Sequence, residues 1–177
     1  MNISGLSTKY EVSPVSVDNV KEIYELCMKN TLFYLYCPPY VTESSILEDL
    51  RPSKSNRVNI NLGFYDHGKL IAILYLVDNY PEEGTVFIRL FMTDVSVQHK
   101  GVGTLIISEL SAALALQGYK KLRLGWVEGN LQSQNFWQKN VFTTTGESYG
   151  CKEYYFVTVA ERPLRILPAI TDYPKAA

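Results

Sequence analysis

The segment from Thr85 to Val127 constrains the fold most, because its apolar residues change their spacing twice. It runs from TVFIRLFMTDVSV through QHKGVG into TLIISELSAALALQGY and then into KLRLGWV. The first and last stretches are short and apolar, which predicts strands. The stretch between them has apolar residues at helical spacing and ends at Gly118, which predicts a helix over residues 104–117. A strand, a helix and a strand in this order predict a parallel crossover.

The stretch QHKGVG, residues 98–103, places Gly101 and Gly103 where the strand gives way to the helix. Glycines there let backbone N–H groups turn toward one point, and the first helical turn adds unpaired donors and partial positive charge. The stretch therefore predicts an anion site, most simply for a phosphate, although a plain glycine turn has the same pattern. Ile106 stands where a dinucleotide fingerprint needs its third glycine, and the P-loop signature is absent, so both are rejected.

The segments on either side predict a mostly antiparallel order of strands. A first helix is expected over Val17–Asn30 behind the candidate cap Asp18. The aromatic stretch that follows breaks at two prolines, and a short helix restarts near Thr42 and ends before Pro52. Strands are expected at residues 10–17, 58–66, 70–80, 85–97, 121–127, 142–146 and 153–160, and a last helix at 131–140.

This order of elements predicts an α+β fold with no repeat or linker that would divide it. We expect one domain over residues 1–177, with an ordered core at about 10–163. A length of 177 residues with 46% hydrophobic residues is enough to bury a sizeable core. The net charge of -1 argues against nucleic acid or an anionic membrane as the main partner.

Targeting and redox signals are weak in this sequence. The first residues, MNISGLSTKYEVSPVS, lack the apolar core of a signal peptide, so we expect a cytoplasmic protein without a membrane span. Three cysteines without paired spacing predict reduced thiols. The two histidines, His67 and His99, lie far apart, so no metal site is expected.

Two motifs identify a family that the chain resembles. Residues 98–103 match the pattern Gln/Arg-x-x-Gly-x-Gly/Ala completely, and residues 130–142, NLQSQNFWQKNVF, match Asn-x-x-Ala-x-x-Phe-Tyr-x-Lys-x-Gly-Phe in part. Both motifs, and the order of elements from residue 10 to about 163, resemble those of the GNAT family of N-acetyltransferases. The chain departs from the second motif at Ser133, Trp137 and Val141, where Ala, Tyr and Gly are usual.

The resemblance implies a mixed sheet of about seven strands flanked by about four helices, with two splayed strands that form an acyl-CoA cleft. Acetyl-CoA would lie between the strands, its arm held by backbone groups and its pyrophosphate by the amides of residues 99–104. No metal is implied. The residues implied to bind acetyl-CoA are Phe91, Met92, Thr93, Gln98, His99, Lys100, Gly101, Val102, Gly103, Thr104, Asn130, Ser133 and Trp137.

The catalytic groups are less defined. Some relatives carry Glu where this chain has Arg89, and an arginine cannot act as a base at neutral pH. Glu128 and Asp94 are candidates for a base acting through water, and a solvated surface carboxylate is the alternative for each. Because Trp137 replaces the usual acid Tyr, we expect it to pack against the cofactor arm. The acid would then come from the final strands, where the candidates are Tyr149, Tyr154 and Tyr155.

The resemblance implies transfer of an acetyl group from acetyl-CoA to a primary amine by direct attack in a ternary complex. A small molecule is expected as acceptor in preference to a protein, and a homodimer is a reasonable expectation. Phe33, Tyr34, Tyr36 and Arg89 are the candidate acceptor-binding residues, with core packing as the alternative for the aromatic ones. The alternative function is a non-catalytic acyl-CoA-binding sensor or interaction module, which Arg89 and Trp137 keep open.

Overall fold

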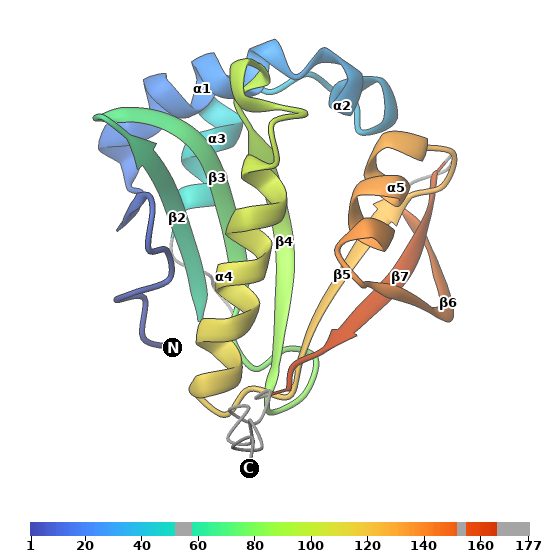
Figure 1. Ribbon diagram of the computed structural model, residues 1–177. Helices are drawn as coiled ribbons and strands as arrows, with labels where there is room; N and C mark the ends of the chain where they lie inside the picture. Colours follow the sequence, from blue (N-terminus) through green and yellow to red (C-terminus); the bar gives the residue numbers. More distant parts are fainter. Residues whose placement is uncertain (52–57, 152–154, 166–177) are drawn as a thin grey trace.

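Seven strands in the described ranges form one open sheet in the order β1-β2-β3-β4-β5-β7-β6 (Figure 1). The computed structural model describes residues 1–51, 58–151 and 155–165. Neighbouring strands are antiparallel except β4 and β5, which are parallel, so the predicted crossover and the α+β class are confirmed. The strands are β1 Glu11–Pro14, β2 Asn59–Asp66, β3 Lys69–Val77, β4 Thr85–Thr93, β5 Lys121–Val127, β6 Thr143–Cys151 and β7 Tyr155–Pro163.

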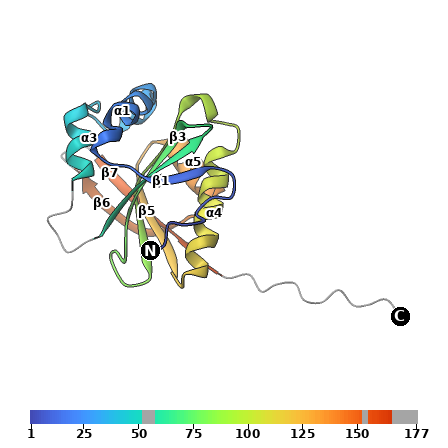
Figure 2. The ribbon, with the colours of Figure 1, turned by 90° about the vertical axis from the view of Figure 1, so that its left-hand side faces the viewer.

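The helices lie on both faces of the sheet (Figure 2). Within the described ranges there are five α-helices, one more than predicted, because the aromatic stretch after α1 forms a helix of its own. Two 3₁₀ turns, η1 and η2, precede α1 and α4. The bounds are η1 Val17–Asn19, α1 Val20–Lys29, α2 Thr31–Tyr36, α3 Glu43–Leu50, η2 Val95–Val97, α4 Val102–Leu116 and α5 Leu131–Lys139.

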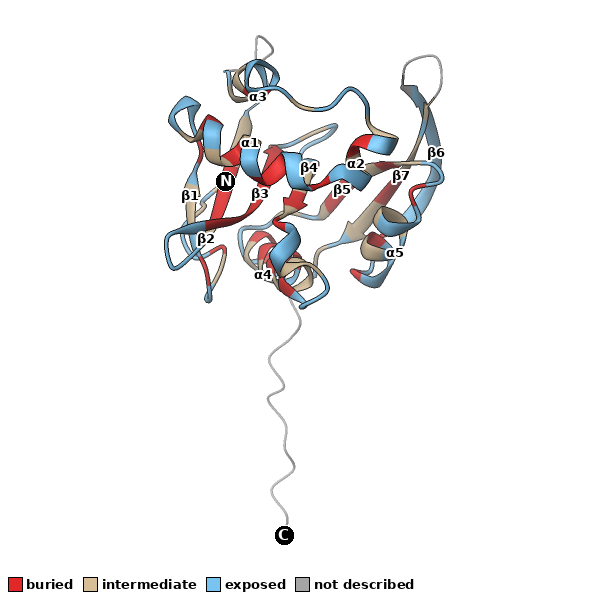
Figure 3. Ribbon diagram, turned by 90° about the horizontal axis from the view of Figure 1, so that it is seen from above, coloured by how far each residue is buried: buried red, intermediate tan, exposed pale blue. Residues whose placement is uncertain are grey.

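The alternation of side chains along β3 divides the core into two clusters. Ile73 and Tyr75 pack with α1 and α3 on one face, whereas Ala72 and Leu74 pack with α4 on the other. All four are buried, and in the view from above β3 and β4 lie between α1 on one side and α4 on the other (Figure 3). The central strands are therefore covered on both faces, and the two halves share one sheet.

Helix α4 follows the predicted pattern closely. Its residues Ile106, Ile107, Leu110 and Leu114 are fully buried, and burial of such side chains stabilises a fold by about 1.5–3 kcal/mol each. Gly118 follows the helix with φ 86°, a left-handed conformation that glycine adopts without strain, so its predicted role at the helix end is confirmed.

Several predicted boundaries are wrong for local reasons. The strand predicted to reach Val97 ends at Thr93, because the Asp94 carboxylate accepts the Ser96 N–H and starts η2. Ser16, not Asp18, caps the first turn. Strand β6 extends beyond Gly146, whose φ of 84° falls in a bulge, and residues 153–154 of the last predicted strand lie outside the described ranges.

No helix in the described part of the chain combines the length and the apolar character that a membrane crossing requires.

Candidate active site

Strands β4 and β5 are paired along their first halves only. Parallel pairing joins Thr85–Ile88 to Lys121–Leu124, and beyond these residues the described pairings of β4 are with β3 and those of β5 are with β7. A bulge at Arg89 marks the separation, because Leu76 pairs with Ile88 and Tyr75 with Leu90. An extra residue bends its strand, and the upper halves of β4 and β5 diverge as a V (Figure 1). The predicted splay is confirmed.

The inner edge of β4 presents backbone groups to the space between the strands. The Asp94 N–H donates to the Ile71 carbonyl at 2.8 Å, so that pair of residues is hydrogen-bonded across the β3–β4 ladder. In an antiparallel ladder the N–H and C=O of one residue point to the same side, and those of the next residue point to the other, so the N–H and C=O of Thr93 and of Phe91 face away from β3. These are donors and acceptors for a ligand that extends alongside β4.

A cavity of about 450 Å³ lies between the diverging strands. All the residues predicted to bind acetyl-CoA line it except Lys100, which is exposed, and Val102, the first residue of α4, which is buried in the core. The sequence motifs thus meet at one place, although residues 98–104 and 130–137 come from separate elements. Their role in binding stays a prediction.

The loop before α4 has the backbone geometry of an anion site. His99 and Gly101 are left-handed, with φ of 60° and 80°, and the Gly101 carbonyl accepts the Leu105 N–H at 2.9 Å. In a helix that begins at Val102, the first N–H groups have no partner within the helix, and they face an end that carries partial positive charge. Turns of this kind direct successive N–H groups into one concavity.

Gly101 and Gly103 are needed for different reasons. Gly101 supplies the left-handed backbone, whereas Gly103 permits close approach of α4 to the opposite wall. A Cβ on Gly103 would lie 3.0 Å from Phe136 Cε2 and 3.5 Å from Phe91 Cε1. The second glycine of the motif therefore sets the width of the cavity at the helix N-terminus.

Aromatic side chains form the wall opposite α4. Phe91 stacks on Phe136 with ring centroids 5.8 Å apart, and Trp137 contacts Phe91, Phe136 and Phe142 at 6.0, 4.9 and 5.1 Å. Trp137 is 7% exposed and belongs to the α4 core cluster, yet it also lines the cavity. Trp137 therefore packs in the hydrophobic core and also lines the cleft, where it was predicted to contact the cofactor arm.

Asp94 is held in an ion pair. Its carboxylate lies 2.9 Å from Lys29 Nζ and also accepts the backbone N–H and the hydroxyl of Ser96. Burial alone would raise the pKa of this carboxyl, but the hydrogen bonds from Ser96 and Lys29 outweigh it and bring the pKa to about 2. Such a carboxylate is a weak proton acceptor, and the geometry favours a structural role that joins the end of α1 to η2.

Of the other predicted catalytic groups, Glu128 and Tyr149 lie outside the lining of the cavity. Glu128 is exposed at the end of β5, where its carboxylate is 3.4 Å from Ser148 Oγ and 3.5 Å from Thr158 Oγ1. Tyr149 is 55% exposed and donates its hydroxyl to Glu147. Tyr154 falls outside the described residues. The assignment of a base and an acid stays a prediction.

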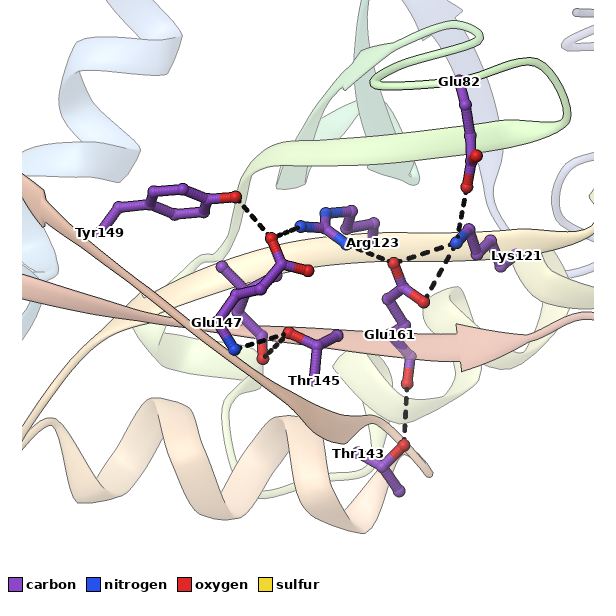
Figure 4. A network of polar contacts seen from close by, with 9 residues as sticks. Glu82, Lys121, Arg123, Thr143, Thr145, Glu147, Tyr149 and Glu161 are labelled. Atoms are coloured by element: carbon purple, nitrogen blue, oxygen red, sulfur yellow. Dashed lines mark hydrogen bonds and ion pairs between the residues drawn. The ribbon is translucent and has the colours of Figure 1, made fainter.

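A network of charged side chains occupies the face of β5 that points away from α5 (Figure 4). Arg123 lies between Glu147 of β6 and Glu161 of β7, and Lys121 pairs with Glu161 and with Glu82. Arg123 is opposite Phe87, below the point where β4 and β5 separate. The network therefore ties the C-terminal strands together beneath the cavity.

The candidate acceptor-binding residues separate into two groups. Phe33 lines the cavity, and Tyr36 approaches the β5–α5 loop, with its Cε1 3.9 Å from the position of a Cβ on Gly129. Tyr34, in contrast, is 7% exposed within the α1 core cluster. Arg89 does not line the cavity, because it forms a 2.7 Å ion pair with Asp49 of α3.

Six further residues line the cavity and were not predicted. Four of them lie on one face of α5 at positions i, i+3, i+4 and i+7, and of these only Phe136 stands at helical spacing from a predicted residue, three positions after Ser133. Asn30 gave no sequence signal, because its contact depends on how the end of α1 meets the end of β4. The six are Asn30, Val97, Gln132, Asn135, Phe136 and Lys139.

Comparisons with known proteins agree with this geometry. A model of the acetyltransferase (GNAT) family matches residues 20–142. An acetyltransferase from Thermus thermophilus superposes with a TM-score of 0.72 at 17% identity, covering 88% of this chain and 97% of that chain. No curated protein sequence matches the chain.

Two other solved structures share the fold. An acetyl transferase from Salmonella typhimurium that modifies the N-terminal serine of 50S ribosomal subunit protein L7/L12 has a TM-score of 0.73 at 16% identity, covering 89% of this chain and 96% of that one. The PaiA N-acetyltransferase of Thermoplasma acidophilum, solved in complex with coenzyme A, has a TM-score of 0.62 at 17% identity, covering 85% and 97%. The match to residues 20–142, on a sheet that splays as the motifs predict, places this chain in the acetyltransferase (GNAT) family as an acyltransferase.

Proposed function

We propose that the protein transfers an acetyl group from acetyl-CoA to a primary amine within the V between β4 and β5. The observation that carries the proposal is the end of β4–β5 pairing at Ile88 and Leu124, which opens a cavity lined by both motifs. The family match makes acetyl-CoA the expected donor. The cavity has room for an extended arm, and the left-handed backbone at Gly101 supplies donors for a pyrophosphate.

Backbone groups would do most of the binding. The peptide N–H groups of Phe91 and Thr93 would hold the extended arm and would donate to the carbonyl oxygen that gains charge during transfer. The amides at the start of α4 would bind the pyrophosphate. Phe91, Phe136 and Trp137 would cover the arm and exclude water.

The reaction would proceed without a covalent enzyme intermediate. The neutral amine of the acceptor forms the new bond to the acetyl carbonyl carbon, the carbon–sulfur bond breaks, and the proton lost by the amine balances the thiol that leaves. This chain must deliver the amine uncharged and allow that proton to move, through water or a side chain. None of the predicted base candidates lines the cavity, and a proton relay through water fits this arrangement better than direct abstraction.

A small amine is the proposed acceptor. Tyr36 approaches Gly129 across the top of the V, and Phe33 lines the same space, which favours an enclosed pocket. A protein N-terminus is the second candidate, because the Salmonella structure described above is of an enzyme that modifies an N-terminal serine. A single domain over residues 1–177, a cytoplasmic location and a homodimer complete the proposal.

The test is release of free thiol from acetyl-CoA across a panel of amines. Polyamines, amino acids, aminoglycosides and short peptides with a free N-terminus would be compared, with Gly103→Asp as the inactive control. We expect turnover with at least one small amine and intersecting initial-rate lines. Turnover with peptides alone would indicate a protein acceptor instead of a small amine. Parallel initial-rate lines would contradict direct attack in a ternary complex. Binding of acetyl-CoA without turnover on any amine would indicate that the protein is a non-catalytic acyl-CoA-binding module.

A further inference from the structure

Asn30 is a buried polar residue at the C-terminus of α1, and its side chain makes three hydrogen bonds. It is 9% exposed. Its Nδ2 donates to the Leu26 carbonyl at 3.0 Å and to the Thr93 carbonyl at 3.1 Å, and its Oδ1 accepts from Gln98 Nε2 at 2.8 Å. The side chain therefore uses both amide hydrogens and its oxygen, and a group satisfied in this way has one orientation.

Gln98 completes a polar cluster in the lining of the cavity. Its Nε2 donates to the Thr93 carbonyl at 3.3 Å in addition to Asn30. The Thr93 carbonyl thus accepts from one side chain of α1 and from one side chain of the loop before α4. Asn30, Thr93 and Gln98 all line the cavity, and we call these three residues the Asn30 clamp.

The clamp determines which backbone groups the edge of β4 offers. The Thr93 carbonyl lies on the edge that faces the V, where an extended ligand could otherwise pair with it. With that carbonyl taken, the edge offers the N–H of Thr93 and both groups of Phe91. The clamp also fixes Gln98 between the edge of β4 and the loop that begins at His99.

We infer that Asn30 is a positioning residue for the arm of acyl-CoA, through its hold on the Thr93 carbonyl and on Gln98. The inference rests on the proposed function. Asn30 acts through Thr93 and Gln98 and has no part in proton transfer. It links the end of α1 to the edge of β4 along which the arm of the cofactor would lie.

A helix cap is the competing explanation for Asn30, and α5 offers a matched comparison. Asn140 follows α5 as Asn30 follows α1, is 4% exposed, and donates its Nδ2 to the carbonyl four residues earlier, that of Phe136, at 2.8 Å. Asn140 does not line the cavity. The two asparagines therefore share the cap bond, and only Asn30 has the clamp.

The experiment compares Asn30→Ser with Asn140→Ser. A serine hydroxyl can donate to the carbonyl four residues earlier, so it retains the cap bond, but it is too short to reach Thr93 and Gln98. Each variant is titrated calorimetrically with CoA and with adenosine 3′,5′-bisphosphate, which lacks the arm. For Asn30→Ser we expect the Kd for CoA to rise about tenfold, the effect of one or two lost hydrogen bonds. Asn140→Ser should stay within about twofold of the wild type, and neither variant should change binding of the bisphosphate.

The outcomes separate the inference from the proposed function. If the wild-type protein does not bind CoA, the proposed function itself is wrong. Wild-type binding with an unchanged Kd in Asn30→Ser overturns the clamp, and so does an equal loss for CoA and the bisphosphate, which would indicate a general disturbance. If Asn30→Ser does not fold, Asn30→Asp is used in its place. The aspartate has the size of asparagine and still accepts from Gln98, but its carboxylate cannot donate to the Thr93 carbonyl and repels it. CoA affinity equal to that of the wild type in that variant also overturns the inference.

Discussion

At the scale of single residues, Gly101 and Gly103 of QHKGVG differ in how far the sequence predicts their roles. The motif predicts a backbone that approaches an anion closely, and the structure gives Gly101 a left-handed φ of 80°. The requirement at Gly103 could not be predicted, because it depends on Phe136, a residue from another helix. The local sequence predicts a local backbone conformation, whereas it does not predict a contact between Gly103 and a residue of another helix.

Gly103→Asp should abolish CoA binding, since it adds a side chain and a negative charge at the N-terminus of α4. The new Cβ meets Phe136 at 3.0 Å, so we also expect a loss of stability of about 1–3 kcal/mol from overpacking. Gly103→Asn is the matched control of equal size without charge. Calorimetry should show weaker CoA binding for Asp than for Asn, and equal affinities would show that no anion binds at this loop.

Trp137→Phe should reduce both stability and cofactor affinity. Trp137 packs on Phe142 and Phe136 and is 7% exposed, so the smaller ring leaves a space that costs about 1–3 kcal/mol of unfolding free energy. CoA affinity should fall by about 1 kcal/mol from lost contact area. The pH dependence of turnover should be unchanged, because an indole donates no proton near neutral pH. Intact affinity with lost turnover would instead give the indole a part in catalysis.

At the scale of elements, α1, η2 and the end of β4 are joined by polar contacts that the sequence did not indicate. The predicted strand over residues 85–97 was too long, because its apolar residues continue through Val97 while the Asp94 carboxylate stops the ladder. The parallel crossover was predictable, because its two strands and the helix between them, α4, each have a clear apolar pattern. The bulge at Arg89 was not, since a single extra residue leaves no periodic signal.

The Lys29–Asp94 pair gives the junction of α1 and η2 a defined pH dependence. The pKa of Asp94 is lowered from 3.8 to about 2, so its ionised form stabilises the fold above pH 4, and this contribution is lost as the pH falls through about 2. The stability advantage of the wild type over Asp94→Asn should therefore shrink by about 1 kcal/mol between pH 6 and pH 3, measured by denaturant unfolding. Lys29→Met should show a smaller change, and an advantage independent of pH would contradict the ion pair.

At the scale of the whole molecule, the V is a product of sheet topology. Antiparallel pairing holds β4 to β3 and β5 to β7, while the short parallel contact at Thr85–Ile88 is the hinge from which they diverge. α4 and α5 lie on either side of the opening (Figure 1). The order of elements predicted this arrangement through family resemblance, whereas the acceptor side depends on side chains that helical spacing alone does not place.

Backbone amide NMR of the ¹⁵N-labelled protein during titration with CoA tests most directly whether the cofactor binds between β4 and β5. We expect the largest shift changes at the amides of Phe91, Thr93, Gly101 and Gly103, which line the cavity between β4 and β5. The hollow at the opposite end of the sheet, lined by Gly84 and Gly118, provides the internal control and should not change. Changes that gather at Gly84 and Gly118, or none at all at saturating CoA, would contradict a cofactor site in the V.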